Sequence, residues 1–157
     1  MNILYCGDSN IAKGVFMSVI SLADNTTEPL DIYIVTAGFS YAGKDYKPLK
    51  KDFKVLLSSY LKTKNPSHRV YLSDESELFK RELPQANLDT RFTPFCMLRL
   101  IADMLDYLPE KILYIDNDVI CRGDFSDFYQ KDITEYELAG VLDHYGRWFF
   151  RRKILVL

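Results

Sequence analysis

Apolar positions along the chain alternate between short continuous runs and helical spacing. The runs Asn2 to Cys6, Leu30 to Val35 and Arg69 to Leu72 are typical of strands buried in a sheet. Between them, apolar residues three or four positions apart predict two amphipathic helices, one after an Asn10 cap and one from Leu49. Strands that alternate with helices favour a mostly parallel sheet with flanking helices, so the expected fold class is α/β.

The rest of the chain repeats this alternation. Apolar spacing predicts a helix from Pro94 to Leu108, which Pro109 ends. Two further apolar runs, Lys111 to Ile115 and Leu138 to Leu142, predict strands that are each followed by acidic residues. Ligands of open α/β sheets bind beyond the carboxyl ends of the strands, so these acidic residues are candidate site residues.

The triplet Asp116, Asn117 and Asp118 follows the first of these two strands, and Asp143 follows the second. In an extended segment, Asp116 and Asp118 would point to the same side roughly 6.5 to 7 Å apart, with Asn117 facing away. Two carboxylates are hard oxygen ligands for Mn²⁺ or Mg²⁺, and a bound diphosphate would complete the coordination shell. The same triplet also fits a solvated strand end or turn, and this alternative stays open.

Composition narrows the class of protein without naming a function. The 157 residues fit one domain, and 48% hydrophobic, 14% aromatic and 27% charged residues describe an ordinary globular protein rather than a disordered or membrane-spanning one. A formal net charge of -2 argues against nucleic-acid binding, which usually requires a strongly basic surface.

Three widely spaced cysteines, Cys6, Cys96 and Cys121, each adjoin apolar residues. This odd number favours buried thiols in a reducing compartment over a disulfide framework. The sequence does not open on a basic region followed by a long apolar run. We therefore expect a cytoplasmic protein, located at the inner face of the membrane if its tail contacts lipid.

Four separated motifs occur in a specific order. They are Cys-Gly-Asp-Ser-Asn at residues 6–10, Arg99 in a helix before an apolar strand, Asp-x-Asp at residues 116–118, and Asp143 after the next strand. This order resembles glycosyltransferase family 8, which includes glycogenin and bacterial lipopolysaccharide galactosyl- and glucosyltransferases.

The resemblance covers Met1 to about Tyr145. It implies a glycosyltransferase A-type, Rossmann-like nucleotide-sugar-binding domain over residues 1–145. Residues 146–157 form a basic-aromatic tail that fits a fragment boundary, a frameshifted end or a short membrane-surface segment. We favour truncation among these three.

The resemblance also assigns roles to single residues. The loop from Cys6 through Gly7 to Asn10 would hold the nucleotide, with Asp8 and Asn10 at the uracil and ribose end. A helix cap and a turn are the alternative for Asp8 and Asn10.

Three later residues complete the implied donor site. Arg99 would reach the donor sugar or its phosphates, Asn117 would contact the donor, and Asp143 would hydrogen-bond the transferred sugar. The alternatives are an exposed helical charge or a structural salt bridge for Arg99, and a solvated turn for Asp143.

The implied activity is metal-dependent, retaining hexosyl transfer. Glucose or galactose would pass from a UDP-sugar to a hydroxyl of a carbohydrate or glycoconjugate acceptor, with Mn²⁺ or Mg²⁺ held by Asp116 and Asp118. Family members continue with Phe-Asn-Ser/Ala-Gly, Asp-Gln-Asp and His-x-x-Gly-x-x-Lys segments, which do not occur in this sequence. We therefore expect a chain that is incomplete and weakly active or inactive.

Two other functions stay open. One is a non-catalytic donor-binding remnant, alone or completed by a second chain, which would explain why the later motifs do not occur. Whether the chain forms a homo-oligomer stays open. A haloacid dehalogenase-type phosphatase would use Asp116 as its nucleophile and Asp118 as its acid/base. That motif usually lies near the N-terminus with further residues well downstream, whereas only 39 residues follow Asp118.

Overall fold

The computed structural model describes residues 1–83, 88, 94–140 and 154–156, the last three by their backbone only. The chain divides into two compact units, Met1–Phe125 and Ser126–Leu157, and each is described by itself. The domain boundary expected at residue 145 stays a prediction.

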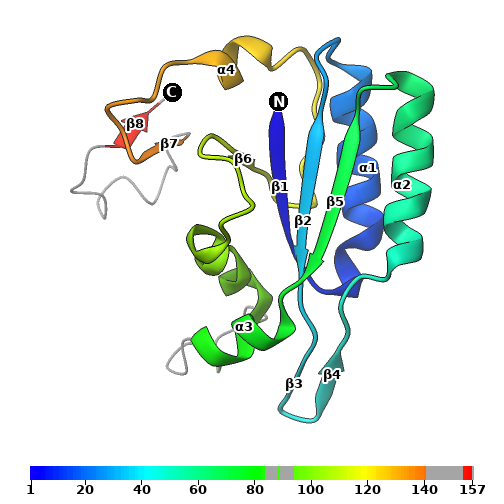
Figure 1. Cartoon of the computed structure of the whole chain (residues 1–157), viewed down its shortest axis with the longest axis vertical. Coiled ribbons are helices and arrows are strands. Elements are labelled where there is room, and N and C mark those ends of the chain that lie inside the picture. Colours follow the sequence, from blue (N-terminus) through cyan, green and yellow to red (C-terminus); the bar gives the residue numbers. More distant parts are fainter. Residues whose placement is uncertain (84–87, 89–93, 141–153, 157) are drawn as a thin grey trace. The chain divides into compact units, whose positions relative to one another are not determined.

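The first unit is built on a four-stranded parallel sheet. Its strands are β1 (Asn2–Gly7), β2 (Asp31–Thr36), β5 (Arg69–Asp74) and β6 (Leu113–Tyr114), in the order β5-β2-β1-β6 (Figure 1). The parallel pairing places the carboxyl ends of all four strands at the same edge. The expected α/β class with a mostly parallel sheet is confirmed.

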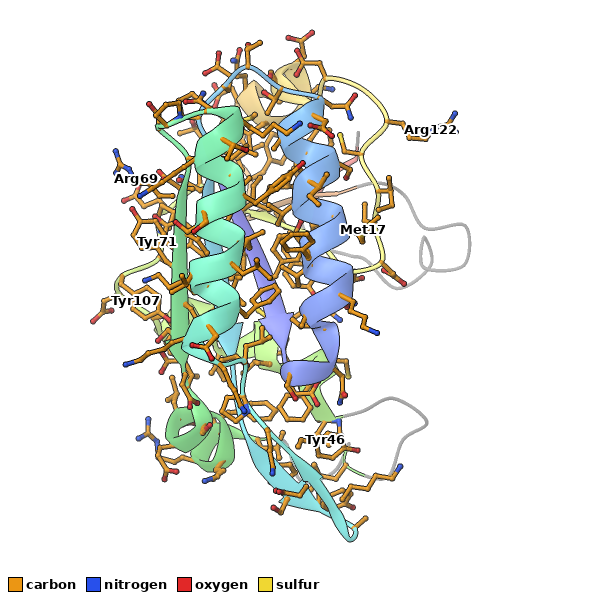
Figure 2. All side chains as sticks on the ribbon, turned by 90° about the vertical axis from the view of Figure 1, so that its right-hand side faces the viewer. Met17, Tyr46, Arg69, Tyr71, Tyr107 and Arg122 are labelled. Carbon is orange, nitrogen blue, oxygen red and sulfur yellow. The ribbon has the colours of Figure 1, made fainter. Side chains whose placement is uncertain are left out.

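Two α-helices cover one face of this sheet, α1 (Ala12–Asp24) and α2 (Lys51–Lys64), which lie side by side in Figures 1 and 2. Their apolar faces meet the inward side chains of the strands, and each fully buried Leu, Ile or Val there contributes about 1.5–3 kcal/mol. The buried residues of this cluster include Ile3, Tyr5, Val15, Val19, Leu22, Ile32, Ile34, Leu57, Leu61 and Val70.

The other face is covered by α3 (Ser76–Glu82) and by a 3₁₀ helix, η3 (Pro94–Met104). Its buried residues include Leu4, Val35, Ala37, Phe79, Phe95, Leu98 and Ile101. Hence β1 and β2 pack against apolar side chains on both faces, as their continuous apolar sequences require, whereas Tyr71 of β5 is 37% exposed.

The helix expected from Pro94 to Leu108 is shorter and of a different type. Its buried residues, Pro94, Phe95, Met97, Leu98 and Ile101, fall into two rows with a spacing of three. A 3₁₀ helix has three residues per turn, so this spacing keeps both rows facing the sheet over the whole element.

The start of α1 differs from the expectation in its cap. Asn10 lies inside a short 3₁₀ helix, η1 (Ser9–Ile11). The backbone N–H of Asn10 donates a hydrogen bond to the side chain of Asp8 at 3.3 Å. The cap is therefore Asp8, and α1 follows from Ile11 without a side-chain cap.

Two elements of the first unit were not expected from the sequence. One is α3, and the other is the hairpin of β3 (Phe39–Tyr41) and β4 (Lys44–Tyr46). Its two-residue loop has positive φ at both Ala42 (48°) and Gly43 (76°). Such a loop usually carries Asn-Gly or Asp-Gly, so Ala-Gly gave no hairpin signal.

The second unit contains α4 (Ser126–Gln130), β7 (Leu138–Gly140) and β8 (Ile154–Val156). β7 and β8 pair in parallel, so part of the expected tail is built into this unit. The strand expected from Leu138 begins as predicted, and its last two positions lie outside the described residues.

The cysteines and helices bear on two further expectations. Cys6, Cys96 and Cys121 are free thiols, and they are half-buried rather than buried. Within the described ranges, none of the helices combines the length and the apolar character needed to cross a bilayer.

Candidate functional site

The carboxyl end of β6 carries the Asp-x-Asp segment. The pairing of β6 with β1 continues for one hydrogen bond, from Ile115 N to Leu4 O at 3.0 Å. The chain then forms a turn, closed by a bond from Val119 N to Asp116 O at 3.2 Å. Asp116 and Asp118 are both exposed on this turn. The extended geometry assumed from the sequence is therefore wrong, because the strand ends before the first carboxylate.

Asn117 faces the protein, and α1 approaches it closely. A Cβ atom built on Gly14 would lie 2.5 Å from the backbone oxygen of Asn117 and 2.4 Å from its Nδ2. These distances are too short for any side chain, so α1 can pack here only because residue 14 is glycine. The sequence analysis missed Gly14, although a glycine inside a helix costs about 1 kcal/mol relative to alanine and indicates a packing constraint.

Beyond the turn, the chain is fixed to the other end of α1. Cys121 N donates to Ser21 Oγ at 2.9 Å, and Asn25 Nδ2 donates to Cys121 O at 3.3 Å. The two acidic residues are therefore held between the sheet on one side and α1 on the other.

Arg99 reaches this segment from η3. Its Nε donates to Cys96 O at 2.8 Å, which fixes the side chain, and its Nη1 lies 3.7 Å from Asp116 Oδ1. The guanidinium carbon lies 4.7 Å from the centre of the Tyr114 ring. The structure thus brings Arg99 and Asp116 together, and the Arg99 guanidinium makes an electrostatic contact with the Asp116 carboxylate.

Tyr114 was not among the residues singled out from the sequence. Its hydroxyl donates to Asp116 Oδ1 at 2.6 Å. Burial, followed by this hydrogen bond, raises the pKa of the Tyr114 hydroxyl, and the nearby Arg99 opposes the shift. The signal available in the sequence was the two-residue repeat of a strand, which puts Tyr114 and Asp116 on the same side.

Cys6 lies within β1 rather than in the loop after it, paired with Val35. Burial raises the pKa of its thiol to about 12; Arg99 partly opposes this shift, and Asp116 adds to it. The thiol is therefore protonated at neutral pH, and only a thiolate is an effective nucleophile or metal ligand.

The loop after β1 is closed by its own polar groups. Asp8 is 5% exposed, and its Oδ2 accepts a bond from Asn10 Nδ2 at 2.6 Å. Gly7 is buried, and its carbonyl accepts from Thr36 Oγ1 at 2.7 Å. These contacts agree with the alternative in which Asp8 and Asn10 form a helix cap and a turn. Contacts of Asp8 and Asn10 with a donor stay a prediction. Because β1 and β6 are parallel neighbours, this loop and Asp116 lie at the same edge of the sheet.

Two carboxylates suit a cation that takes its remaining ligands from a diphosphate. In the part of the chain that the structure describes, three or more His, Cys, Asp or Glu side chains do not converge on any point where they could hold a metal. The donor set therefore fits Mn²⁺ or Mg²⁺ as a partial site. Asp143 lies outside the described residues.

The geometry can be compared with known proteins. The sequence matches the family described as Glycosyl transferase family 8 over residues 2–155. A lipopolysaccharide 1,3-galactosyltransferase of Salmonella typhimurium is 26% identical over 156 residues, which cover 98% of this chain and 42% of that protein.

Solved structures of LgtC have the same fold. The galactosyltransferase LgtC in complex with donor and acceptor sugar analogs superposes with a TM-score of 0.71 at 16% identity, covering 91% of this chain and 47% of that one. An active-site mutant of LgtC gives 0.69 at 17% identity, with coverage of 91% and 46%. The expected glycosyltransferase A-type fold is confirmed, and this chain spans less than half the length of these relatives. Because the match extends over all but three of its residues, the chain belongs to glycosyltransferase family 8.

Proposed function

We propose that this chain is the donor-binding part of a metal-dependent, retaining hexosyltransferase. Its substrates are a UDP-linked glucose or galactose and a carbohydrate or glycoconjugate acceptor. One observation carries the proposal: two exposed carboxylates, Asp116 and Asp118, lie on the turn that follows β6, with the Arg99 guanidinium 3.7 Å from Asp116. This edge of a parallel sheet is where α/β folds bind nucleotides.

The chemistry of the reaction explains these residue types. Negative charge grows on the diphosphate as the bond between sugar and phosphate breaks. A divalent cation held by Asp116 and Asp118 would neutralise that charge as a Lewis acid. Arg99 would add hydrogen bonds to the phosphate oxygens, because a guanidinium presents several N–H donors in one plane.

Other residues would orient the donor. In this proposal Cys6 and Gly7 at the end of β1, and Asp8 and Asn10 in the loop after it, border the nucleotide, since the end of β1 lies at the same edge of the sheet as Asp116. Asn117 holds the turn against α1 and borders the donor, and Asp143 binds the transferred sugar. Such positioning lowers the entropy lost on the way to the transition state.

The relatives support a sugar donor and a sugar acceptor as substrate classes. One is described as a lipopolysaccharide galactosyltransferase, and LgtC was solved with analogs of both sugars. This chain spans 42% of the former's length, and donor binding with weak or no transfer stays a prediction. A cytoplasmic location and contact of the tail with a membrane stay predictions.

A donor-binding remnant is the second candidate, because the acceptor-side motifs of the family do not occur in the sequence. Binding without turnover in any longer natural form of the chain would favour it. The phosphatase alternative has lost its support, since the family match covers residues 2–155.

The test is calorimetric titration of UDP into the full chain with and without Mn²⁺. Wild type is expected to bind UDP only with Mn²⁺, and Asp116→Ala/Asp118→Ala to lose that binding. The matched control is Asp103→Ala/Asp106→Ala, which removes two exposed carboxylates elsewhere and the same charge. Mn²⁺-independent binding, or equal losses in both double variants, would refute the proposed site.

A further inference from the structure

Tyr114 contacts both charged groups of the candidate donor site. Its hydroxyl donates to Asp116 Oδ1 at 2.6 Å, and its ring lies 4.7 Å from the Arg99 guanidinium carbon. We propose that Tyr114 is a positioning residue that holds the metal-binding carboxylate with its hydroxyl and the phosphate-binding arginine with its ring. This inference rests on the proposed function and adds a residue to it.

The sheet fixes Tyr114 itself. It is one of the two residues of β6 and pairs in register with Leu4 of β1, whose side chain is buried. The next residue, Ile115, donates its N–H to Leu4 O at 3.0 Å. The tyrosine therefore extends from backbone that is hydrogen-bonded into the sheet, whereas Asp116 stands on the turn that follows.

The hydroxyl restricts the Asp116 carboxylate before a cation arrives. Both recorded contacts of this carboxylate, with Tyr114 and with Arg99, engage Oδ1. A carboxylate held through one oxygen has lost its freedom to rotate and keeps the other oxygen for a ligand. Hydrogen-bond partners of metal-binding side chains typically change metal affinity 10- to 100-fold when they are removed.

The ring gives Arg99 a defined place. The side chain of Arg99 is 40% exposed, and a long exposed arginine samples many rotamers unless it is held. Here Nε bonds Cys96 O and the guanidinium lies against the ring of Tyr114. Stacking uses the flat face of the guanidinium and leaves its N–H groups, which lie in the plane, for phosphate oxygens.

The chain offers a natural control for a purely structural tyrosine. Tyr107 also donates its hydroxyl to a carboxylate oxygen, Glu75 Oε1, at 2.9 Å. Figure 2 shows Tyr107 beside β5, on the same side as Arg69 and Tyr71. β5 and β6 are the two outermost strands of the sheet, with β2 and β1 between them. Loss of the Tyr107 hydroxyl removes the same kind of hydrogen bond from a carboxylate, that of Glu75, to which the proposal gives no metal-binding role.

The experiment compares Tyr114→Phe with Tyr107→Phe in the full chain. Mn²⁺ is titrated in the presence of UDP, and free Mn²⁺ is followed by electron paramagnetic resonance. We expect Tyr114→Phe to weaken Mn²⁺ binding about tenfold and Tyr107→Phe to change it less than twofold. Melting temperatures of the two variants are expected to fall by similar amounts, because each loses one comparable hydrogen bond.

A double-mutant cycle separates positioning from general damage. On an Asp116→Asn background, Tyr114→Phe should cause no further loss of Mn²⁺ affinity, since its effect acts through that carboxylate. A further tenfold loss there would overturn the inference. Equal Mn²⁺ affinity of Tyr114→Phe and wild type, with binding lost in Asp116→Ala/Asp118→Ala, would also overturn it and leave the proposed function standing. No Mn²⁺ binding by wild type would overturn both.

Discussion

At the scale of single residues, the buried polar groups are hydrogen-bonded within the fold. Within the described ranges, every buried side-chain nitrogen or oxygen has a hydrogen-bond partner. Tyr5 pairs with Ser18 at 2.7 Å, and His68, which is 2% exposed, accepts from Leu30 N at 2.9 Å. His68 is therefore a structural residue.

The state of His68 predicts a pH dependence of stability. Burial, with a smaller effect of the N-terminal ammonium, lowers the pKa of His68 below its ordinary 6.5, and Asp31 only partly opposes this. Below pH 6.5 the unfolded chain binds a proton that the folded chain does not, so the free energy of unfolding falls as pH decreases. Urea unfolding at pH 7.5, 6.5 and 5.5 measures the slope.

The control for this prediction is His68→Gln, whose amide oxygen can accept the Leu30 N–H without titrating. We expect a shallower loss of stability between pH 6.5 and 5.5 in the variant. Identical slopes in wild type and variant would show that His68 does not contribute to the pH dependence.

At the scale of elements, the sequence predicted what periodicity encodes and missed what depends on contacts through space. β1, β2 and β5 follow continuous apolar runs, and their bounds differ from the prediction by at most two residues. Asp116 and Asp118 were found because they end such a run. Gly14 was missed because its importance comes from a contact with Asn117, which lies on a different element. Tyr114 was missed because its importance comes from Arg99, which lies on another.

The contact between α1 and the Asp-x-Asp turn predicts the effect of a single methyl group. Gly14→Ala would overlap the backbone of Asn117, and relief of that overlap must move the turn. We expect a loss of about 1–3 kcal/mol in the free energy of unfolding, together with weaker Mn²⁺-dependent UDP binding. Urea unfolding and calorimetry measure the two effects.

Gly123→Ala is the matched control for this prediction, because a Cβ atom there meets no atom within 4 Å. Its stability should stay within about 0.5 kcal/mol of wild type, with unchanged UDP binding. If Gly14→Ala behaves like Gly123→Ala, α1 does not position the turn.

At the scale of the whole molecule, the described residues of the candidate donor site fall in one of the two compact units. Both hydrophobic clusters and all described donor-site residues belong to the unit Met1–Phe125. The chain spans less than half the length of LgtC.

A chain that ends at Phe125 is therefore expected to fold. It should bind UDP with Mn²⁺ within about twofold of the full chain, which is a difference of only about 0.4 kcal/mol in binding free energy. Any additional affinity for UDP-galactose or UDP-glucose over UDP should be lost, since Asp143 is removed. Circular dichroism and calorimetry provide the two measurements. Loss of cooperative melting would show that residues 126–157 are part of the folding unit.

The pairing of β6 with β1 also sets the order in which the protein is assembled during synthesis. Asn2 Nδ2 donates to Lys111 O across 109 positions of sequence, whereas β1, β2 and β5 are joined by shorter connections. Contacts between distant residues close slowly, because a long loop must first be ordered. On a ribosome, the first three strands can pair before Lys111 has emerged from the exit tunnel. A nascent chain stalled at that stage would hold most of its sheet and no place for a nucleotide sugar.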